Sequence, residues 1–350
     1  MINSPFFTKK LMAWYEPENR PLPWKNTQNP YYIWLSEIIL QQTRAEQGRP
    51  YYEKFIEAYP NLTALANAPD DEVMRLWQGL GYYSRARNLV ATARHIQLHH
   101  EGVFPKIYEE IRALKGVGDY TAAAIASFAY NQAYSVLDGN VFRLLARFFG
   151  IHTPIDSTLG KKEFASLAQK LLDTQEPAKY NQAIMDFGSV VCKPQKPLCQ
   201  TCPLREKCVA FQAQTVELLP VKAKKMNRKN RYFYYLVMEN EKNEVFIQKR
   251  QNKDIWQNLY EFPMIELNDI EPVAAFLNNP LFSNFFQDQI FTIKNFSATH
   301  KQVLSHQNII AVFVKMSVAK DFQLDTAFKV SITDLQYYAF PRIIRTYLDK

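Results

Sequence analysis

Residues 114–121 have the sequence Leu114-Lys115-Gly116-Val117-Gly118-Asp119-Tyr120-Thr121 and lead into an alanine-rich segment. Two glycines one residue apart permit a tight turn and leave backbone N–H groups uncovered. At a helix N-terminus such donors, together with the helix dipole, bind anions. The glycine pattern alone is common in helix–helix turns. Between two amphipathic helices, however, it predicts a helix-hairpin-helix over about residues 111–130, with Gly116 and Gly118 at a DNA phosphate.

Working outward from the hairpin, apolar residues recur at three- and four-residue spacing up to about residue 220, which predicts helices. The clearest helical stretches are 30–43, 71–81, 84–97, 121–130, 140–150 and 164–173. Beyond residue 231 the chain is rich in β-branched and aromatic residues, which predicts strands. These stretches are 232–238, 244–250, 308–316 and 328–332, with helices expected at 271–280 and 342–350. We expect an all-α domain over residues 1–220 and an α+β domain over residues 232–350.

The charge of the chain is unevenly distributed. Its 42 Lys and Arg against 34 Asp and Glu give a net charge of +8, and residues 221–231 alone hold six basic and no acidic side chains. This segment is therefore predicted to be a basic linker between two nearly neutral domains. It could contact a polyanion or be a solvated tether, and charge alone does not separate these interpretations.

Length and composition exclude several classes of protein. A chain of 350 residues suggests two or three domains, and 47% hydrophobic residues argue against disorder. It contains no apolar run of about 18 residues, so no membrane span is expected. The N-terminus lacks the small-residue cleavage site of a secretion signal. We expect a cytoplasmic protein, associated with the nucleoid if the source is prokaryotic.

All four cysteines lie within seventeen residues, at Cys192, Cys199, Cys202 and Cys208. In a cytosolic protein, such dense cysteines bind metal more often than they form disulfides. Four thiolates suit either a tetrahedral zinc ion or a four-iron cluster. Zinc ribbons usually pair two short Cys-x2-Cys knuckles, whereas this chain has one. The 6-2-5 spacing is similar to the [4Fe-4S] loop of the endonuclease III superfamily of DNA glycosylases.

Two carboxylates occupy unlike surroundings. Glu37 stands in a helix that is apolar on nearly every side, so burial should raise its pKa and let it hold a proton near neutral pH. Asp138 precedes Gly139 and Asn140 at the start of a helix, where the dipole favours its ionised form. A proton-holding acid beside a persistent anion is the pair that cleavage of a glycosidic bond requires. Alternatively, Asp138 only caps the helix and Glu37 pairs with a core arginine.

Six motifs in order identify the chain as similar to the adenine DNA glycosylases of the MutY family. The motifs are residues 22–24, 34–43 and 79–89, the glycine hairpin, residues 137–141 and the cysteine loop. The resemblance implies that Glu37 protonates the adenine ring and that Asp138 stabilises or traps the oxocarbenium ion. It also implies that Gln42 and Tyr82 wedge into the duplex opposite the extruded adenine. Such enzymes flip the target base out of the stack.

Position 120 separates relatives within the superfamily. Members that also cut the DNA strand carry a lysine nucleophile there, whereas this chain has Tyr120. We therefore expect a monofunctional glycosylase, with Tyr120 lining the pocket beside Asn140; the alternative is a tyrosine that only packs the hairpin. The family commonly has arginine at the position of Lys25, and an arginine fork offers planar contacts that lysine lacks. Arg20 is expected to share the DNA-binding role of Lys25.

The C-terminal half resembles the Nudix-like domain of the family. The segment after residues 259–263 lacks the glutamate-rich helix of Nudix pyrophosphatases, so nucleotide hydrolysis is not expected. The resemblance implies recognition of 8-oxoguanine by Ser305 and His306. The family's usual phenylalanine is replaced by Leu304 and its preceding histidine is displaced to His300. Without the resemblance, His306 would be interpreted as a surface residue.

The sequence thus predicts a monomeric DNA N-glycosylase that hydrolyses adenine from A:8-oxoguanine or A:G mispairs in double-stranded DNA. One alternative is a pyrimidine-damage glycosylase with lyase activity, which Tyr120 and the β-rich domain disfavour. The other is a lesion-binding protein without turnover, against which Glu37 and Asp138 argue.

Overall fold

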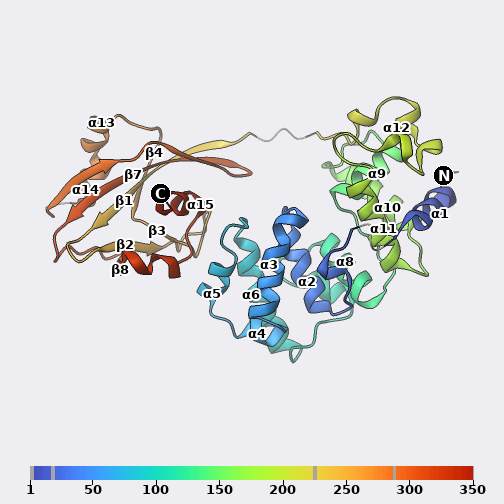
Figure 1. The fold of residues 1–350 in the computed structure, drawn as a ribbon, viewed down its shortest axis with the longest axis horizontal. Coiled ribbons are helices and arrows are strands. Elements are labelled where there is room, and N and C mark those ends of the chain that lie inside the picture. Colours follow the sequence, from blue (N-terminus) through green and yellow to red (C-terminus); the bar gives the residue numbers. More distant parts are fainter. Residues whose placement is uncertain (1–3, 17–19, 224–226, 287–288, 350) are drawn as a thin grey trace. The chain divides into compact units, whose positions relative to one another are not determined.

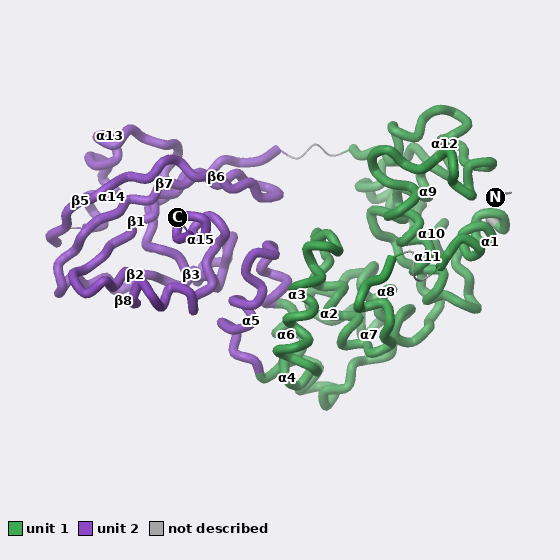
Figure 2. Tube along the Cα trace, in the orientation of Figure 1, with its two compact units in different colours: residues 1–67, 88–225 green, residues 68–87, 226–350 purple. Residues whose placement is uncertain are grey.

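The chain is described by a computed structural model that covers residues 4–16, 20–223, 227–286 and 289–349. It divides into two compact units, coloured separately in Figure 2. Unit 1 consists of residues 1–67 and 88–225, and unit 2 of residues 68–87 and 226–350. Segment 68–87 therefore groups with the C-terminal half, although it lies within the helical half of the sequence.

Unit 1 is helical (Figure 1). Its α-helices are α1 (Ser4–Trp14), α2 (Pro30–Leu40), α3 (Ala45–Ala58), α4 (Leu62–Ala66), α6 (Ser84–His99), α7 (Tyr108–Ala113), α8 (Asp119–Tyr130), α9 (Gly139–Phe149), α10 (Thr158–Leu171), α11 (Pro177–Val190) and α12 (Val209–Gln212), with α6 starting in unit 2. Short 3-10 turns are η2 (Pro23–Lys25), η3 (Cys199–Thr201), η4 (Arg205–Lys207) and η5 (Val216–Leu218). Proline begins α2 and α11, where its missing N–H would have no intrahelical partner.

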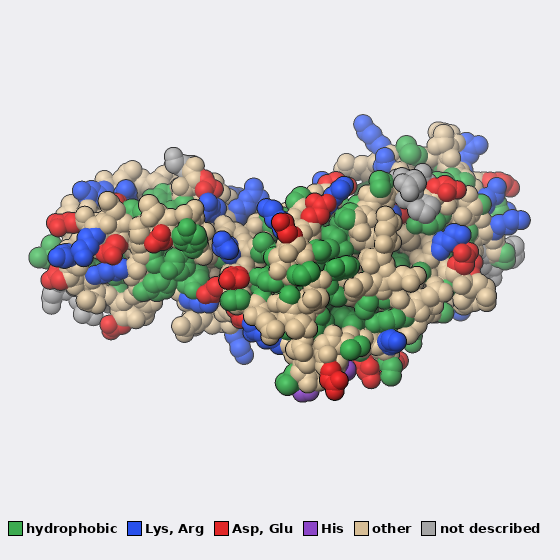
Figure 3. All heavy atoms as spheres, turned by 60° about the horizontal axis from the view of Figure 1, so that its bottom comes forward, with side chains coloured by type: hydrophobic (Ala, Val, Ile, Leu, Met, Phe, Trp, Pro, Cys, Tyr) green, Lys and Arg blue, Asp and Glu red, His purple; other side chains and the backbone are tan. Residues whose placement is uncertain are grey.

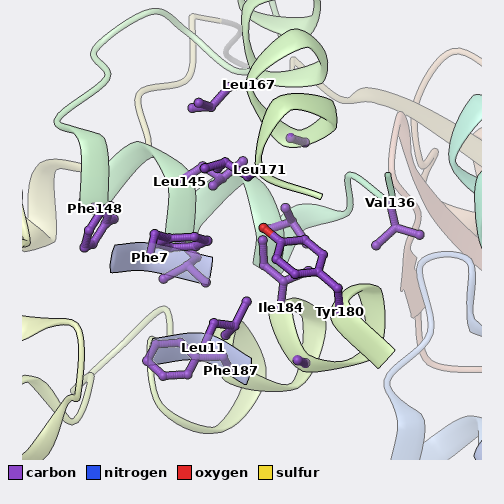
Figure 4. Packing of buried hydrophobic residues seen from close by; sticks show 14 of the residues in the cluster. Phe7, Leu11, Val136, Leu145, Phe148, Leu167, Leu171, Tyr180, Ile184 and Phe187 are labelled. Atoms are coloured by element: carbon purple, nitrogen blue, oxygen red, sulfur yellow. The ribbon is translucent and has the colours of Figure 1, made fainter. Parts of the chain in front are cut away.

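The core of unit 1 fixes α9 and α11 against α1 (Figure 4). The rings of Phe7 in α1 and Phe148 in α9 lie 4.9 Å apart, and Phe187 of α11 belongs to the same buried cluster. Burying such rings is the main favourable term in packing helices together. This core therefore sets the position of two helices, α9 and α11, that also contribute residues to the cleft described below.

Unit 2 is built on an eight-stranded mixed sheet. Its strands are β1 (Lys229–Glu239), β2 (Glu244–Lys249), β3 (Tyr260–Glu261), β4 (Met264–Leu267), β5 (Phe291–Phe296), β6 (His300–Val303), β7 (Gln307–Val318) and β8 (Phe328–Ser331). The strand order is β3-β2-β1-β7-β5, with β4 on β1, β6 on β7 and β8 on β2. The central pair β1 and β7 is parallel, and the other pairs are antiparallel. The helices are α5 (Asp70–Leu76), α13 (Val273–Leu277), α14 (Pro280–Phe286) and α15 (Arg342–Leu348), with the 3-10 turn η6 (Ile332–Tyr337).

The side chains of β1 lie alternately on the two faces of this sheet, because successive residues of a strand point in opposite directions. Tyr234 stacks on Phe276 of α13 with ring centroids 4.0 Å apart. Tyr235, on the other face, stacks on Phe313 of β7, which in turn stacks on Tyr347 of α15 at 3.9 Å. Both faces of the sheet are therefore covered by helices.

The predicted basic linker is shorter than its charge pattern indicated. Residues 229–231 form the start of β1, and Arg231 pairs with Asp254 at 2.9 Å and with Glu266 at 2.7 Å. Ala223 N–H donates to Asp156 Oδ1 in unit 1 at 2.9 Å. Residues 224–226 lie outside the described part of the chain. The sequence-based interpretation missed the start of β1 because paired arginines in a strand look, in sequence, like solvated charge.

Each sequence-predicted element overlaps an observed one, although several predicted stretches extend beyond the observed ends. The six helical stretches correspond to α2, α5, α6, α8, α9 and α10, and the four strand stretches to β1, β2, β7 and β8. The last helices correspond to α13 and α15. Within the described residues, no helix is both long enough and apolar enough to cross a membrane.

Candidate active site

Unit 1 contains a cleft of about 970 Å³ whose walls include parts of α2, α8, α9 and α11. Its lining brings together seven residues that the sequence predicted for the site: Arg20, Lys25, Glu37, Gln42, Tyr120, Asp138 and Asn140. These residues span more than a hundred positions of sequence. The cleft therefore exists only because the helices of unit 1 pack as they do.

Glu37 lies on the buried side of α2. Its neighbours Trp34, Leu35 and Ile38 are buried, and Glu37 itself is 6% exposed. Burial raises the pKa of Glu37 to about 7, and the charge of Asp138 adds to the rise, while a hydrogen bond from the Tyr120 hydroxyl opposes it. The predicted rise in pKa is confirmed, so this carboxyl group can hold a proton near neutral pH.

Asp138 is the N-cap of α9. Its Oδ1 accepts the backbone N–H groups of Asn140 at 2.8 Å and Val141 at 2.7 Å, and its Oδ2 accepts the Asn140 side-chain amide at 2.7 Å. These donors favour the ionised carboxylate, yet burial outweighs them and the pKa of Asp138 is raised. The expectation that the helix start alone would keep this group ionised needs this correction. Burial in the cleft was not visible in the sequence.

Tyr120 and Asn140 connect the two carboxyl groups to their surroundings. Tyr120 lies in the first turn of α8, and its pKa is raised well above the ordinary value by burial and by the nearby charges of Glu37 and Asp138. It is therefore a neutral hydrogen-bond donor to Glu37. Asn140 holds Asp138 through both its backbone and its side chain. The structure thus places Tyr120 in the cleft and not merely in the packing of the hairpin.

A buried arginine joins Asn140 to the cysteine loop. Arg143, one turn further along α9, donates to Asn140 Oδ1 at 2.9 Å and to the backbone oxygen of Cys192 at 2.7 Å. It also donates to the Gly188 backbone oxygen in α11. Position 188 requires glycine, because a Cβ there would lie 2.8 Å from the backbone oxygen of Asn140. Asn140 is therefore fixed from three sides.

Arg20 and Lys25 meet at a buried acid. Lys25 Nζ lies 2.5 Å from Asp186 Oδ2 and 2.7 Å from the Arg20 backbone oxygen, and Arg20 Nη1 lies 3.3 Å from Asp186 Oδ1. Asp186 is fully buried. Burial lowers the pKa of Lys25, while the Asp186 carboxylate opposes that fall. Both predicted DNA-binding residues therefore line the cleft, where they neutralise a buried carboxylate.

The glycine hairpin joins α7 to α8 as predicted. Gly116 has φ +82°, and a Cβ there would lie 2.9 Å from Asn88 Cβ, so only glycine fits without strain. Gly118 is the N-cap of α8, and the space where its Cβ would be is open. Gln41 Nε2 reaches the Gly116 backbone oxygen at 3.4 Å. This contact ties the hairpin to the end of α2.

The two predicted wedge residues have positive φ angles, 59° for Gln42 and 47° for Tyr82. Gln42 follows α2 at the cleft in unit 1. Tyr82 belongs to unit 2 and is 46% exposed. The Arg85 guanidinium lies over the Tyr82 ring at 5.5 Å and donates to the Gly81 backbone oxygen at 3.2 Å. Gln42 and Tyr82 therefore both adopt a backbone conformation that residues other than glycine rarely populate.

Ser305 and His306 occupy the turn between β6 and β7. Leu304 N–H donates to the Gln307 oxygen at 2.8 Å, which closes the turn. Within unit 2 the hydroxyl oxygens of Ser305 and Tyr82 are in contact. His300 instead lies in β6 and packs edge-on against Phe313, with ring centroids 5.2 Å apart. The structure therefore brings Ser305 to Tyr82 and keeps His300 out of the turn.

The four cysteines line one small cavity beside α9. Arg147 Nη1 donates to Cys192 Sγ at 3.5 Å and to the Lys193 backbone oxygen at 2.7 Å. Burial raises the pKa of Cys202 to about 11, and the charges of the other three thiols contribute to that rise. All four sulfurs therefore lie within electrostatic reach of one another.

The two candidate metals require different spacings of their thiolate donors. A zinc ion binds thiolates at about 2.3 Å, which requires sulfurs within roughly 4 Å of one another. Among the described residues, no three His, Cys, Asp or Glu side chains are arranged to hold a single ion. A four-iron cluster takes the same four thiolates but is larger and spaces them more widely. The four cysteines around one cavity are the type of ligand set that either a zinc ion or a four-iron cluster takes.

Several residues of the site were missed from sequence, chiefly in α11. Gln182 lines the cleft, Asp186 pairs with Lys25, and buried Asn181 contacts the loop before Asp138. A signal was present, because Pro177 is followed by apolar residues at helical spacing. What sequence could not show is which polar residues of this helix face inward.

Comparisons with known proteins agree with this architecture. Residues 35–171 match the model of the HhH-GPD superfamily of base excision DNA repair proteins, and residues 234–350 match the NUDIX domain. A solved thermostable thymine-DNA glycosylase aligns with 60% of this chain and 97% of its own, at 27% identity and a TM-score of 0.56. A solved endonuclease III, in a non-covalent DNA complex, has the same fold at 22% identity and a TM-score of 0.53, over 61% of this chain and 99% of its own.

Fold and cleft together therefore define a helix-hairpin-helix DNA glycosylase that is joined to a NUDIX-like domain. A DNA glycosylase is a hydrolase of base excision repair. An adenine DNA glycosylase of Buchnera aphidicola subsp. Acyrthosiphon pisum is 30% identical over 346 residues, 98% of this chain and 97% of its own. That of the Baizongia pistaciae subspecies is 38% identical over 270 residues, 75% of each chain. The chain belongs to the adenine DNA glycosylase family.

Proposed function

We propose that the protein removes adenine from duplex DNA in which adenine is mispaired with 8-oxoguanine or guanine, and leaves an abasic site. One observation carries this proposal. Glu37 is buried in the cleft with a pKa of about 7, hydrogen-bonded by Tyr120 and within electrostatic reach of Asp138. A proton-holding carboxyl group beside a second carboxylate is what cleavage of an N-glycosidic bond needs.

The flipped adenine would enter the cleft, since its glycosidic bond is inaccessible inside the helix. Glu37 then donates its proton to a ring nitrogen of adenine, which makes the base a neutral leaving group. The bonding electrons leave with the base and a positive charge develops on the sugar. Tyr120, which stays neutral, holds the Glu37 carboxyl group in position by its hydrogen bond.

Asp138 stabilises the sugar cation. Its two oxygens are fixed by Asn140 and Val141, so it needs little reorganisation as charge develops. A water molecule then adds to the cationic sugar carbon and returns its proton to Glu37. The products are free adenine and an abasic site, and Glu37 is again protonated for the next cycle.

The enzyme is proposed to be monofunctional. Tyr120 occupies the place of the lysine nucleophile of strand-cutting relatives. In the described part of the chain, two amines line the cleft, Lys25 and Lys179. Lys25 Nζ lies 2.5 Å from Asp186 Oδ2, and Lys179 Nζ lies 3.3 Å from Glu176 Oε1. A protonated, ion-paired amine does not attack an aldehyde. No stable amine adduct with the abasic site is therefore expected.

The remaining predicted residues receive DNA-binding roles. Gly116 and Gly118 would present backbone N–H groups to a phosphate, which positions DNA without recognising its sequence. Gln42 and Tyr82 would fill the space left by the flipped base. Ser305 and His306, in the exposed β6–β7 turn, would contact 8-oxoguanine.

We also propose that Cys192, Cys199, Cys202 and Cys208 hold one [4Fe-4S] cluster, whose role when bound is to stabilise the end of the helical unit. Arg143 and Arg147 then connect its loop to α9. A monomer suffices for every step above. A cytoplasmic location stays a prediction.

Three duplexes test the proposal: one with adenine opposite 8-oxoguanine, one with cytosine opposite 8-oxoguanine and one with thymine glycol opposite adenine. Release of adenine from the first duplex alone supports the proposal. Strand nicking at thymine glycol would instead indicate a pyrimidine-damage glycosylase with lyase activity. Tight binding of the first duplex without base release would indicate a lesion-binding protein.

A further inference from the structure

Asn181 is a fully buried amide at the centre of unit 1. Its Nδ2 donates to Ser127 Oγ at 2.8 Å and to the Tyr134 backbone oxygen at 2.8 Å, and its Oδ1 accepts the Val136 N–H at 3.1 Å. Both amide hydrogens and one lone pair are therefore used. A buried polar side chain with this complete set of partners fixes its neighbours in one arrangement.

Asn181 and its partners connect three parts of the proposed site. Val136 lies two residues before Asp138, in a segment between α8 and α9 without regular structure. Ser127 is in α8, the helix whose first turn carries Tyr120. Asn181 itself is in α11, next to Gln182 in the cleft lining. The Asn181 side chain thus connects α8, which carries Tyr120, to the loop before Asp138 and to α11, which forms a wall of the cleft.

We propose that Asn181 is a positioning residue for Asp138, acting through the backbone at residues 134 and 136. The inference rests on the proposed function, in which Asp138 stabilises the sugar cation. The Asp138 side chain is capped onto α9, but the direction from which the chain enters that cap is set by the preceding residues. Displacement of a reacting group by about 1 Å can cost roughly 100-fold in rate.

Gln169 of α10 provides a matched comparison. It holds the same loop by the same kind of group, since its Oε1 accepts the Ser135 N–H at 3.0 Å and its Nε2 donates to the Ala133 oxygen at 2.8 Å. Gln169 is exposed, however, and water can replace it there. Water cannot readily replace Asn181, because Asn181 is fully buried and so are its partners Ser127 and Val136. Loss of the Asn181 amide should therefore move Asp138, whereas loss of the Gln169 amide should not.

The test compares Asn181→Leu with Gln169→Leu in the full chain. Each variant binds two abasic duplexes opposite 8-oxoguanine. One has a pyrrolidine whose ring nitrogen is cationic and mimics the charged sugar, and the other has a neutral tetrahydrofuran. Wild type should prefer the cationic analogue, because Asp138 faces the charge. The ratio of the two affinities reports the placement of Asp138 and is insensitive to a general loss of stability.

For Asn181→Leu we expect the preference for the cationic analogue to fall at least about 10-fold and single-turnover adenine release about 100-fold, with affinity for the neutral analogue within about 3-fold of wild type. Gln169→Leu should match wild type in all three measurements. An unchanged preference in Asn181→Leu, or an equal fall in Gln169→Leu, would overturn the inference.

Two further variants keep the test decisive if Asn181→Leu does not fold. Asn181→Asp has the same shape and can still accept the Val136 N–H, but it places a carboxylate oxygen against the Tyr134 oxygen. It should lose the preference for the cationic analogue. Ser127→Ala leaves both loop contacts of Asn181 intact and should lose less of it than Asn181→Asp. The reverse order would contradict the inference.

Failure of the proposed function gives a different result. If the wild-type protein releases no adenine, the proposed function is wrong whatever the variants do. If the wild type releases adenine and both Asn181 variants keep its rate and its analogue preference, the proposed function stands and only the role of Asn181 is refuted.

Discussion

Glu37 shows how one side chain can be made an acid at neutral pH. A helix that is buried on several sides removes water from the carboxyl group and so penalises its charged form. Asp138 adds a second negative charge in the same cleft. The Tyr120 hydroxyl opposes both effects without cancelling them. The result is a pKa of about 7, where the group holds a proton and can still release it.

The Glu37→Gln variant should lose adenine release while keeping its affinity for the duplex. Glutamine fills the same volume but has no acidic proton to donate, so removal of a general acid should cost about 10²- to 10⁴-fold in rate. Single-turnover base release and duplex binding measure the two quantities. Glu46→Gln, an exposed change in the first turn of α3, is the matched control. Retained turnover in Glu37→Gln would assign the acid to another residue.

The rate of adenine release should decline as the pH rises through about 7, because Glu37 then loses the proton it must donate. At the acidic end, the rate should fall once Asp138 becomes protonated, at a pH above the ordinary 3.8 of an aspartate since its pKa is raised. Single-turnover rates of adenine release measured between pH 4 and pH 9 would record the fall on both the acidic and the alkaline side. A rate that keeps rising above pH 8 would exclude Glu37 as the acid.

The same burial should make Glu37 destabilising at neutral pH. The unfolded chain releases this proton near 4.5 and the folded chain near 7, so stability falls between these values by about 3 kcal/mol. Glutamine carries no such penalty. Glu37→Gln should therefore unfold at the same denaturant concentration as wild type near pH 4 and at a higher one at pH 8. Equal midpoints at both pH values would show that Glu37 is not desolvated.

At this scale the sequence predicted Glu37 well, since the residues that bury it are its neighbours in the same helix. It predicted Asp138 less well, because residues from other helices complete the cleft around it. The partner of Lys25 could not be predicted at all. Asp186 lies 161 positions away, and only the packing of α11 brings it to η2.

At the scale of elements, the hairpin before α8 offers a pair of glycines with different constraints. Gly116→Ala would force a Cβ toward Asn88 at a φ of +82° and should lower stability by about 1 kcal/mol or more. Gly118→Ala meets open space and should leave stability unchanged.

Measurements of DNA affinity distinguish a conformational role of Gly116 from a phosphate-binding role of Gly118. If a phosphate approaches the backbone at residue 118, Gly118→Ala should weaken duplex binding several-fold although the free protein is unperturbed. Thermal unfolding and duplex affinity, measured on both variants, supply the comparison. Wild-type affinity in Gly118→Ala would exclude close approach of a phosphate at this residue.

The elements themselves were predictable where periodicity was long and regular, as in α8 and α9. Helix α3 was missed because Gly48 and Pro50 interrupt its pattern. A Cβ at Gly48 would lie 2.8 Å from Leu40 Cδ2, so a larger residue there would require the Leu40 side chain to shift. The edge strands β5 and β6 were also missed. Neither strand contains a buried residue, so neither shows the continuous apolar run that made β1 and β7 predictable.

For the whole molecule, the net charge of +8 is a poor guide to where DNA binds. On the face drawn in Figure 3, basic and acidic side chains are interspersed. Arg231 of the basic segment is neutralised by Asp254 and Glu266 within unit 2. The helical unit must therefore hold DNA mainly by placed donors. The sequence indicated a nucleic-acid partner by charge but identified it by motifs.

If the protein prefers 8-oxoguanine opposite the target adenine, as proposed, this preference should depend on the β6–β7 turn of unit 2. Ser305→Ala removes a hydroxyl that contacts Tyr82 and would face the lesion. The ratio of adenine release opposite 8-oxoguanine to that opposite guanine should fall about 10-fold, the cost of one hydrogen bond. Ser283→Ala, an exposed change in α14, is the control. An unchanged ratio would remove Ser305 from lesion recognition.

If the cleft that contains Glu37 and Asp138 hydrolyses adenine from DNA without cutting the strand, free adenine and an uncut abasic strand must form together. The most direct measurement incubates the purified protein with a duplex containing one adenine opposite 8-oxoguanine and analyses both products. We predict free adenine together with a strand that stays intact until it is treated with alkali. Strand cleavage without alkali, or no free adenine at all, would contradict this account.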